Sequence, residues 1–331
     1  MEKIDFVVTW VDGNDENWKK EKSRFENKIN KNIDESEERY RDWEIMKYWF
    51  RAVEKNTPWV NKIFFITWGH IPKWLNVNNP KLVIIKHEDY IPTRFLPTFN
   101  SNVIELNLNR IKELSENFVL FNDDMFILKN MKEKEFFING IPRDSFAENA
   151  ITTNKEEDIF PHILLNNMGI INEKFCKKNV YKKNLFKYIN PKYGLKNLRT
   201  IGLLGWSNFS LIYDNHIPVA LCKSTLNQVW NENESILENT SMNRFRSITD
   251  INQYVFRYYQ MLSGNFKPRS FKVGRRLTLT DNNEKIYSII KQRKYKMVCL
   301  NDGKISNFDK TKKELIDAFE YAFNEKSSFE I

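Results

Sequence analysis

Two adjacent carboxylates near the middle of the chain have the type and spacing of a metal or catalytic pair. Asp123 and Asp124 follow Asn122 and the apolar run 118–121, which predicts a buried strand. In an open α/β sheet the ligand crevice lies at the carboxyl ends of the strands. Mg²⁺ binds at such places through one or two carboxylates and the phosphates of a substrate. A strand that runs into an aspartate-rich turn is the simpler alternative.

The elements that must position these carboxylates alternate along the chain. Apolar runs predict strands, at 4–11, 62–67, 81–86 and 118–121. Charged stretches with apolar residues three and four apart predict helices, at 15–30, 37–55 and 100–111, the last capped by Asn100 or Ser101. Near-continuously apolar strands that alternate with helices predict an α/β fold with a doubly wound, mostly parallel sheet. Polar residues follow each strand, and we expect one crevice to collect them: Asp12, Asp15, Trp68, Gly69, His87, Asp89, Asp123 and Asp124.

The chain changes character near residue 150. The stretch 151–265 is basic and mostly helical, with 206–213 as a candidate strand. A strand predicted at 296–300 and an amphipathic helix at 309–324 return to the α/β pattern, and we expect this tail to rejoin the first sheet. The prediction is one α/β domain, made of 1–150 and about 266–331, with a helical insertion at about 151–265.

Composition and charge narrow the class of protein. The chain has 331 residues, of which 41% are hydrophobic, enough for a sizeable core. We expect no signal peptide, and no window approaches the roughly 18–20 apolar residues of a membrane span. Three cysteines (Cys176, Cys222 and Cys299) without a CxxC pair indicate reduced thiols in a cytoplasmic protein.

The net charge of +9 is concentrated in two stretches. The stretch 176–199 has eight Lys or Arg residues and no acid, interleaved with Tyr181, Phe186 and Tyr188, and 265–276 has five more. Basic segments with aromatic residues suit an anionic membrane surface or a phosphate-rich ligand. Nucleic acid would also suit them, although no nucleic-acid-binding motif accompanies them. A solvated helix face is the structural alternative.

Four blocks carry a family pattern: 4–13 with Asp15; 39–124; Pro161-His162; and Arg244-Phe-Arg246 with Asp250 and Tyr258-Tyr259. With Cys299-Leu-Asn-Asp302 and Lys326-Ser-Ser-Phe-Glu330, these blocks resemble the Stealth family of sugar-phosphate transferases. That family includes bacterial capsule phosphotransferases and the animal N-acetylglucosamine phosphotransferase that marks lysosomal enzymes. Many bacterial members have His at the position of Asn102, so no catalytic role is assigned there.

The resemblance implies a glycosyltransferase A-like sheet and a defined reaction. A sugar-1-phosphate would pass from a UDP-sugar to a hydroxyl of a lipid-linked or growing polysaccharide, forming a phosphodiester and releasing UMP. This reaction belongs to capsular or cell-surface polysaccharide synthesis at the cytoplasmic face of the membrane. The implied partners are these substrates and anionic lipid, with no nucleic acid. The implied cofactor is a divalent cation, Mg²⁺ or else Mn²⁺, on Asp123 and Asp124.

The resemblance also suggests roles for single residues. His162 is the predicted base for the acceptor hydroxyl, because an imidazole titrates near neutral pH; Asp12 or Asp15 is the alternative. Arg246 is predicted to act at the transition state, and Asp124 and Asp12 complete the predicted catalytic set. Predicted donor-binding residues come from the same blocks: Trp10, Gly13, Asp15, Arg41, Lys47, Arg51, Asn100, Ser101, Glu105, Asn122 and Arg244.

Structural alternatives accompany several of these roles. Trp10 would stack on uracil or pack in the core, Glu105 would hold a sugar hydroxyl or anchor an arginine, and at least two of the arginines are expected to form ion pairs only. Two other functions remain open. A metal-dependent glycosyltransferase would use the same sheet but release UDP. A non-catalytic lipid- or nucleic-acid-binding module would leave the acids at the strand ends unexplained.

Overall fold

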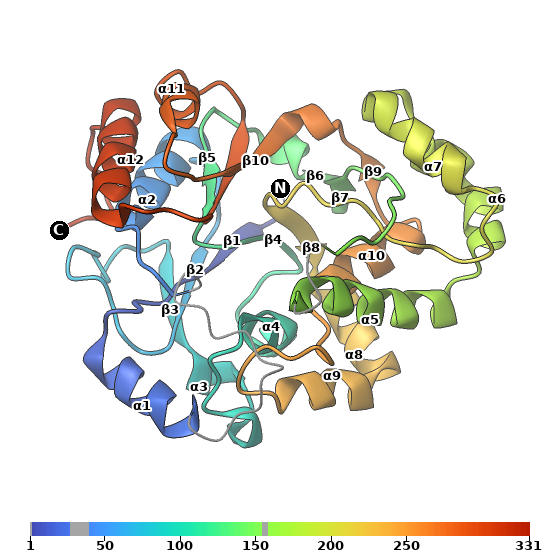
Figure 1. Ribbon diagram of the computed structural model, residues 1–331, viewed down its shortest axis with the longest axis horizontal. Coiled ribbons are helices and arrows are strands. Elements are labelled where there is room, and N and C mark those ends of the chain that lie inside the picture. Colours follow the sequence, from blue (N-terminus) through green and yellow to red (C-terminus); the bar gives the residue numbers. More distant parts are fainter. Residues whose placement is uncertain (1, 27–39, 154–157) are drawn as a thin grey trace.

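A five-stranded sheet forms the centre of the molecule (Figure 1). The computed structural model describes residues 2–26, 40–153 and 158–331. The strand order is β3-β2-β1-β4-β8. β8 is antiparallel to β4 and the other neighbours are parallel: β1 (Ile4–Thr9), β2 (Ile63–Thr67), β3 (Leu82–Lys86), β4 (Asn117–Phe121) and β8 (Val219–Cys222). The predicted α/β class with a mostly parallel sheet is confirmed.

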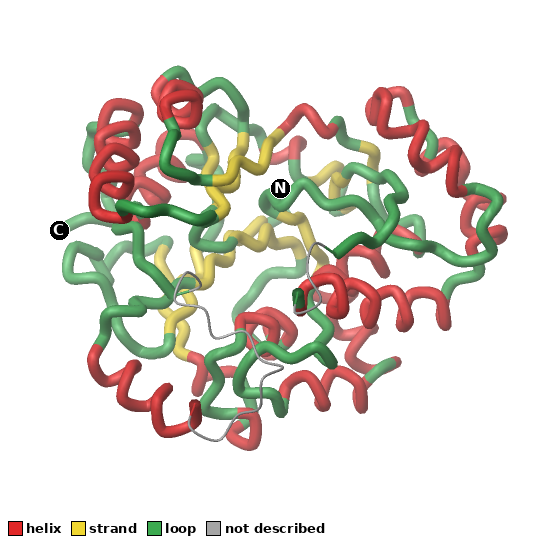
Figure 2. The backbone as a smooth tube through the Cα atoms, in the orientation of Figure 1, coloured by secondary structure: helices red, strands yellow, loops and turns green. Residues whose placement is uncertain are grey.

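Both faces of this sheet are buried, which is why its strands read as continuous apolar runs. Phe6 and Val8 of β1 belong to one apolar cluster, and Val7 belongs to the other. Helices pack on each side of the sheet (Figure 2). The first cluster includes residues of α2 (Met46–Asn56), α11 (Glu284–Lys291) and α12 (Phe308–Ala322). The second includes residues of α5 (Ile159–Lys174), α6 (Lys177–Tyr188), α8 (Lys223–Glu232) and α10 (Tyr254–Leu262).

Two small sheets flank the central one. The order β10-β11-β5 joins β10 (Gly274–Thr278), β11 (Met297–Asn301) and β5 (Met125–Ile127). The order β6-β7-β9 joins β6 (Phe137–Ile138), β7 (Ile141–Asp144) and β9 (Lys267–Pro268). The expectation that the tail rejoins the first sheet is therefore wrong. After β4 the chain turns at 122–124, and β5 offers β11 a separate antiparallel edge.

The remaining elements differ from prediction mainly at their ends. α1 (Glu16–Glu26) begins as predicted, and 27–39 lie outside the described residues. Residues 40–45 are not helical, so the second helix starts later than predicted. The helix predicted at 100–111 is α4 (Ser101–Leu106) followed by a 3₁₀ turn (Leu108–Arg110), with Asn100 as its N-cap. Short or peripheral helices complete the chain: α3 (His87–Tyr90), α7 (Asn197–Leu203) and α9 (Glu234–Ser241).

The segment 206–213 forms no strand, contrary to expectation. Among the residues that the structure describes, its one bridge to another segment is the isolated pair Ile212 and Glu148. Phe209, Leu211 and Ile212 are nevertheless buried, so their apolar character reflects anchoring of an irregular segment. The strand lies later, at β8, and pairs with β4 of the central sheet. The division into a catalytic domain and an insertion stays a prediction, since β8 links the two parts.

Candidate active site

A cavity of about 560 Å³ lies at the carboxyl ends of β1 and β4. Trp10 follows β1 directly, and Asn122, Asp123 and Asp124 follow β4; all four line the cavity. The N-terminus of α4, the loop before β8, the N-terminus of α10 and the end of β11 supply further walls. The place is the one that an open α/β sheet offers to a ligand.

Two carboxyl groups of the cavity, those of Glu105 and Asp123, have pKa values raised to about 7. Glu105 is buried, and its Oε1 accepts a hydrogen bond from Nδ2 of Asn122 at 3.1 Å. Desolvation raises the pKa of Glu105 to about 7, against the opposing charge of Arg246. Asp123 is accessible to solvent within the cavity, but the surrounding protein walls desolvate it. That desolvation, with the charge of Asp124, raises the pKa of Asp123 to about 7. Perturbed acids in a cleft mark a candidate functional site.

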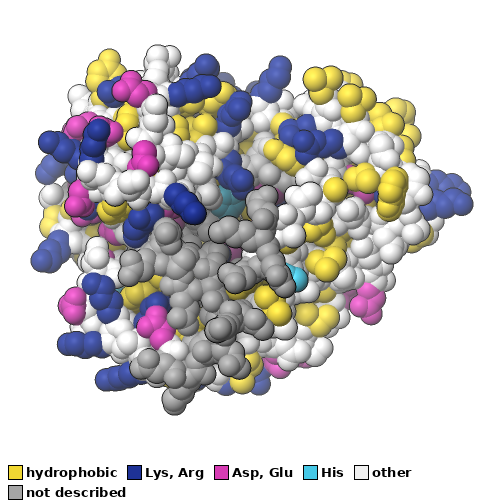
Figure 3. Space-filling view, viewed as in Figure 1, with side chains coloured by type: hydrophobic (Ala, Val, Ile, Leu, Met, Phe, Trp, Pro, Cys, Tyr) yellow, Lys and Arg dark blue, Asp and Glu magenta, His cyan; other side chains and the backbone are white. Residues whose placement is uncertain are grey.

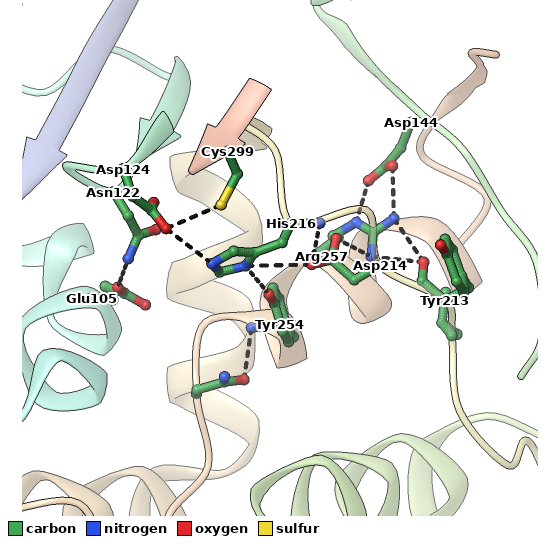
Figure 4. A network of polar contacts seen from close by, with 12 residues as sticks. Glu105, Asn122, Asp124, Asp144, Tyr213, Asp214, His216, Tyr254, Arg257 and Cys299 are labelled. Atoms are coloured by element: carbon green, nitrogen blue, oxygen red, sulfur yellow. Dashed lines mark hydrogen bonds and ion pairs between the residues drawn. The ribbon is translucent and has the colours of Figure 1, made fainter. Parts of the chain in front are cut away.

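Asp124 is held by contacts on one carboxylate oxygen and leaves the other unpaired. Its Oδ2 accepts a hydrogen bond from Sγ of Cys299 at 3.0 Å and lies 3.8 Å from Nε2 of His216 (Figure 4). Its backbone oxygen accepts from the N–H of Leu300 at 2.8 Å, which fixes the turn. Its Oδ1 is buried and has no hydrogen-bond partner among the described residues. An orphaned carboxylate oxygen is a natural metal ligand.

His216 lies in a chain of polar contacts that runs away from Asp124. Its Nδ1 is 2.8 Å from the hydroxyl of Tyr254 and 3.8 Å from Oδ2 of Asp214 (Figure 4). Asp214 lies 3.3 Å from Nη1 of Arg257, whose guanidinium also forms two short hydrogen bonds to Asp144. The network therefore extends from the cavity wall into the protein interior.

The charges of this network set the proton affinity of His216. Burial lowers the pKa of His216, but contact with Asp214 and the charges of Asp124 and Asp214 outweigh it and raise the pKa. Burial raises the pKa of Asp214, yet His216 and Arg257 bring it down to about 2. Asp214 is thus charged at neutral pH and orients the imidazole, as an acid beside a catalytic histidine does.

Strand direction explains why His216 meets Asp124 across 92 positions of sequence. β8 is antiparallel to β4, with Leu120 paired to Val219. The loop that precedes β8 therefore lies at the edge where β4 ends, and it delivers His216 there. In the same way β11 is antiparallel to β5, and Cys299 pairs with Met125 beside Asp124.

Three arginines bring positive charge to the cavity wall. Arg246 donates from Nη2 to Oγ of Ser101 at 2.6 Å. Arg41 donates from Nε and Nη2 to Oδ2 of Asp302 and lies over the ring of Phe308. Arg276 is exposed, and its charge acts to lower the pKa of His216. Guanidinium groups suit phosphate because their planar fork donates two hydrogen bonds at once.

The cavity wall includes eight of the residues that the sequence singled out: Trp10, Arg41, Ser101, Glu105, Asn122, Asp123, Asp124 and Arg246. Trp10 also belongs to the core. Its ring stacks on Phe65 with centroids 5.5 Å apart. One ring face is therefore occupied, and the buried indole N–H is left without a hydrogen-bond partner among the described residues.

Asp12, Gly13 and Asp15 shape the turn after β1 and do not line the cavity. The N–H of Asp12 donates to Nε2 of His70 at 2.8 Å, and Asp15 caps α1 by accepting from the N–H of Trp18. A Cβ at Gly13 would lie 1.8 Å from the backbone oxygen of Tyr40, so a side chain there would push the chain apart. Their predicted roles in binding and catalysis stay predictions.

The other five predicted residues also lie away from the cavity wall. Arg51 is buried and bonds to Glu330, Glu320 and the backbone of Phe323. Asn100 caps α4 and donates to Asp250. The rest are peripheral: Lys47 lies over the ring of Tyr48, Arg244 is exposed over Phe25, and His162 is exposed on α5. Their predicted roles stay predictions.

Several polar residues were not singled out as site residues from the sequence, among them Asp214, His216, Tyr254 and Arg276 of the cavity wall, and Cys299, which contacts Asp124. Two signals pointed to them. The polar run 213–216 precedes the apolar run that forms β8, and Cys299 begins the block shared with bacterial Stealth members. Neither signal gives the strand direction that places them beside Asp124.

Asp124, His216 and Cys299 could together hold a metal, since their ligand atoms lie within 4.8 Å of one another. However, burial raises the pKa of the Cys299 thiol well above its usual value, and the thiol donates to Asp124. A protonated thiol is a poor ligand. The carboxylates of Asp123 and Asp124, with the unpaired Oδ1, fit a hard cation better than this mixed set.

Comparison with known proteins decides the family. Residues 2–30 match the model described as Stealth protein CR1, conserved region 1, and residues 39–144 match Stealth protein CR2, conserved region 2. The capsular polysaccharide phosphotransferase WcwK of Streptococcus pneumoniae is 51% identical over 332 residues, covering 100% of this chain and 98% of that protein. The chain belongs to the Stealth family.

Other relatives of this Stealth protein have related names. The exopolysaccharide phosphotransferase cps2G of Lactiplantibacillus plantarum is 39% identical, covering 99% of this chain and 96% of that protein. The receptor polysaccharide phosphotransferase WefC of Streptococcus gordonii is 39% identical over the full length of both chains. The Stealth protein described here is accordingly a transferase enzyme, as expected.

Solved structures of glycosyltransferases show a weak likeness to the Stealth chain. The apo structure of the bifunctional glycosyltransferase WbbM has a TM-score of 0.38 at 9% identity, covering 96% of this chain and 50% of that chain. Mouse xyloside xylosyltransferase 1 in its apo form also has a TM-score of 0.38, at 10% identity, covering 90% of this chain and 98% of that chain. At such scores the likeness carries no argument about the chemistry.

Proposed function

We propose that this Stealth protein transfers a sugar-1-phosphate from a UDP-sugar to a hydroxyl of a lipid-linked or growing glycan. The transfer forms a phosphodiester, releases UMP and serves capsular or other surface polysaccharide synthesis at the cytoplasmic face of the membrane. One observation carries the proposal: a single cavity combines Asp123, Asp124 and Glu105 with arginines and His216. Phosphoryl transfer needs this combination of cation ligands, cationic donors and a proton acceptor. The relatives' names as phosphotransferases point the same way.

Asp123 and Asp124 are the proposed ligands of a divalent cation, Mg²⁺ or Mn²⁺. The unpaired, buried Oδ1 of Asp124 supports this choice. When bound there, such a cation would neutralise diphosphate oxygens of the donor and the charge that develops on the leaving UMP. Cys299 and His216 then act on Asp124 from the other side and fix its orientation.

His216 is the proposed base for the acceptor hydroxyl. The hydroxyl oxygen attacks the phosphorus linked to the sugar, and a new P–O bond forms as the bond to the UMP oxygen breaks. The hydroxyl proton passes to Nε2 of His216, while Tyr254 and Asp214 hold Nδ1 on the far side of the ring. His216 is preferred to His162 because it lines the cavity.

The arginines have a different task from the acids. Arg246, on Ser101 at the N-terminus of α4, and Arg276 are the proposed donors to the sugar-linked phosphate. Their charge compensates the equatorial oxygens during transfer. The free indole N–H of Trp10 is the proposed contact to the donor nucleotide.

The product nucleotide tests this proposal. Purified protein is incubated with a panel of UDP-sugars, a glycan acceptor and Mg²⁺ or Mn²⁺, and nucleotides are separated by chromatography. UMP is expected, and chelation by EDTA stops its release. Asp124→Asn lowers kcat by about 10³-fold or more, as loss of a charge-stabilising group does, while Asp317→Asn, an exposed aspartate on α12, leaves kcat unchanged. Release of UDP overturns the proposal in favour of glycosyl transfer.

A further inference from the structure

Residues 185–206, at the right of Figure 1, expose several large apolar side chains within a short stretch of sequence. They come from α6, the 3₁₀ helix Pro191–Lys196, α7 and the residues just after it. Phe186 is 83% exposed and Leu195 is 84% exposed. Figure 3 shows hydrophobic side chains gathered over α7 at the upper right. The exposed apolar residues, here called the α6–α7 surface, are Leu185, Phe186, Leu195, Leu198, Ile201, Leu204 and Trp206.

The opposite side of this segment is anchored to the protein, so the apolar side chains remain outside. Thr200 is buried and accepts a hydrogen bond from the N–H of Glu148 at 3.0 Å. Lys177 is also buried and donates to Glu148 and to the backbone oxygen of Leu203. Leu195, Leu198 and Ile201 follow one another at intervals of three, which places them along one outer face of the short helices.

Cations accompany the apolar residues, and acids do not. The stretch 176–199 has eight Lys or Arg residues and no Asp or Glu. Lys177 is used internally, but exposed cations remain at Lys178, Lys182, Lys183, Lys192 and Arg199. Figure 3 shows dark blue side chains at the right edge over α6.

The second basic stretch adds to this charge. It packs against the first through contacts of α6 with β9, and Lys187 has its pKa lowered by burial and by the charge of Lys267. Lys196 lies over the ring of Phe271, which neighbours the exposed Lys272. Two stretches that are about 80 residues apart in the sequence thus contribute charge to one side of the molecule.

We infer that the α6–α7 surface binds an anionic lipid bilayer. Leucine, isoleucine, phenylalanine and tryptophan side chains in a lysine-rich setting match the interface between lipid head groups and acyl chains. Anionic head groups attract the lysines, and the apolar side chains gain free energy by leaving water. Clustered exposed apolar side chains mark a protein or membrane interaction site, and the surrounding lysines favour an anionic membrane.

The position of this surface relative to the cavity favours the same partner. Arg199 donates to Oδ1 of Asn149 at 2.7 Å, and Nζ of Lys196 lies 3.5 Å from the ring centroid of Tyr213. Asn149 and Tyr213 both line the cavity. A bilayer against α7 therefore lies beside the cavity rim, where an acceptor carried on a lipid would arrive. This last step rests on the proposed function; the lipid contact does not.

Vesicle flotation with the full chain tests the inference. The protein is mixed with vesicles of phosphatidylglycerol and phosphatidylcholine, or of phosphatidylcholine alone, and binding is measured against lipid concentration. We expect binding only to the anionic vesicles, and binding that weakens in high salt. Leu195→Ser with Leu198→Ser lowers partitioning by about tenfold or more. Lys178→Gln with Lys182→Gln and Lys183→Gln lowers it about 100-fold, since each lysine near an anionic surface contributes a factor of about five.

Matched variants separate this surface from general charge and hydrophobicity. Lys129→Gln with Lys285→Gln and Lys313→Gln removes the same charge from exposed sites elsewhere, and Val77→Ser removes an exposed apolar residue. These controls are expected to bind vesicles nearly as the unchanged protein does. Melting temperatures verify that every variant is folded. Binding that survives both sets of α6–α7 substitutions, or that is equal on neutral vesicles, overturns the inference.

Two further outcomes are distinguishable. Light scattering that shows a dimer, dissociated by Leu195→Ser with Leu198→Ser, assigns the surface to a second copy of the chain and overturns the lipid inference. Vesicle binding is measured without donor or acceptor, so it does not depend on turnover. A protein that binds vesicles but releases UDP supports the inference while the proposed function fails.

Discussion

His216 lies between two aspartates, each of which faces a different nitrogen of the imidazole. Asp214 faces Nδ1, and the low pKa of about 2 at Asp214 keeps this carboxylate charged throughout the working range. Asp124 faces Nε2, at 3.8 Å from its Oδ2. In the proposed mechanism, one nitrogen of the imidazole is therefore held in place by Asp214 and the other accepts the proton.

Removal of the Asp214 charge is expected to move the pH dependence of turnover. Asp214 raises the pKa of His216, and a base acts only when it is neutral, so activity should rise with pH through that pKa. Asp214→Asn lowers the pKa of His216, shifts the acidic limb of log(kcat/KM) to lower pH and reduces kcat by about 100-fold. Asp144→Asn, which removes the other acid on Arg257, is the control. An acidic limb that does not move in Asp214→Asn contradicts the role of His216.

Burial of Glu105 in the cavity wall disfavours its charged form, and this lowers the stability of the fold where Glu105 is ionised. Its pKa is raised to about 7 from the usual 4.5, so the folded state holds the proton more tightly than the unfolded state. Its contribution to stability is full below about pH 4.5 and is lost as pH rises through about 7.

We compare the free energy of unfolding of Glu105→Gln with that of the unchanged protein. Between pH 4.5 and pH 8 this difference is expected to shift by about 3 kcal/mol in favour of Glu105→Gln. The glutamine oxygen can still accept from Asn122. Urea unfolding of both proteins across this pH range gives the difference, and Glu113→Gln serves as a control remote from the cavity. A difference that is constant with pH contradicts the raised pKa.

Position at a strand end identified the acidic part of the cavity wall, whereas its arginines were predicted from the resemblance to the Stealth family. Asn122, Asp123 and Asp124 were recognisable because they follow an apolar strand, and Trp10 because it ends another. His216 and Cys299 could not be placed in the same way. Their positions depend on two strands that are antiparallel to their neighbours, and direction leaves no periodic signal in a sequence.

At the scale of elements, Arg51 links α2 to the end of the chain. Its guanidinium bonds to both carboxylate oxygens of Glu330 at 2.8 Å and to the backbone of Phe323. The aromatic rings of Phe50 and Phe329 pack beside this contact. The resemblance to the family predicted donor binding for Arg51. In the structure, however, each nitrogen of its guanidinium donates a hydrogen bond within the protein.

Arg51→Met is expected to destabilise the fold and to spare donor binding. It leaves Glu330 buried without its partner, which costs about 3–5 kcal/mol. Lys47→Met, on the same helix and also predicted to bind donor, is the comparison and should cost less than about 1 kcal/mol. Unfolding in urea gives both values, and the KM for the donor is measured on the folded fraction. A large rise in KM without loss of stability would restore a donor role to Arg51.

The elements that the sequence predicted best are the apolar strands of the central sheet. β1, β2, β3 and β4 end within about two residues of their predicted positions. The helix predicted at 37–55 was wrong over residues 40–45, because charged residues keep a helical spacing in an irregular segment as readily as in a helix. The strand predicted at 206–213 was wrong because apolar residues can be buried in an irregular segment without pairing to another strand.

Segments that are far apart in the sequence line one cavity. Its walls come from the ends of β1 and β4, the start of α4, the loop before β8, the start of α10 and the end of β11. A ligand that contacts several of these parts stabilises them together, because it binds the folded state and not the unfolded chain.

Saturation of the cavity is therefore expected to raise the melting temperature of the whole chain. UMP with Mn²⁺ at about 100 times its dissociation constant adds about 2.7 kcal/mol, which corresponds to roughly 3–6 °C. Differential scanning fluorimetry measures this shift, and EDTA should abolish most of it. Asp124→Asn should show little shift with the same mixture. A shift of equal size in Asp124→Asn would place the nucleotide elsewhere.

The pairing of Arg41 with Asp302 has a consequence for synthesis of the protein. A ribosome that has released the chain through residue 265 has already delivered Asp123, Asp124, His216 and Arg246. It has not delivered Arg276, Asn301 or Asp302, which complete the cavity wall. The nascent chain therefore has no finished pocket until its last fifth is translated.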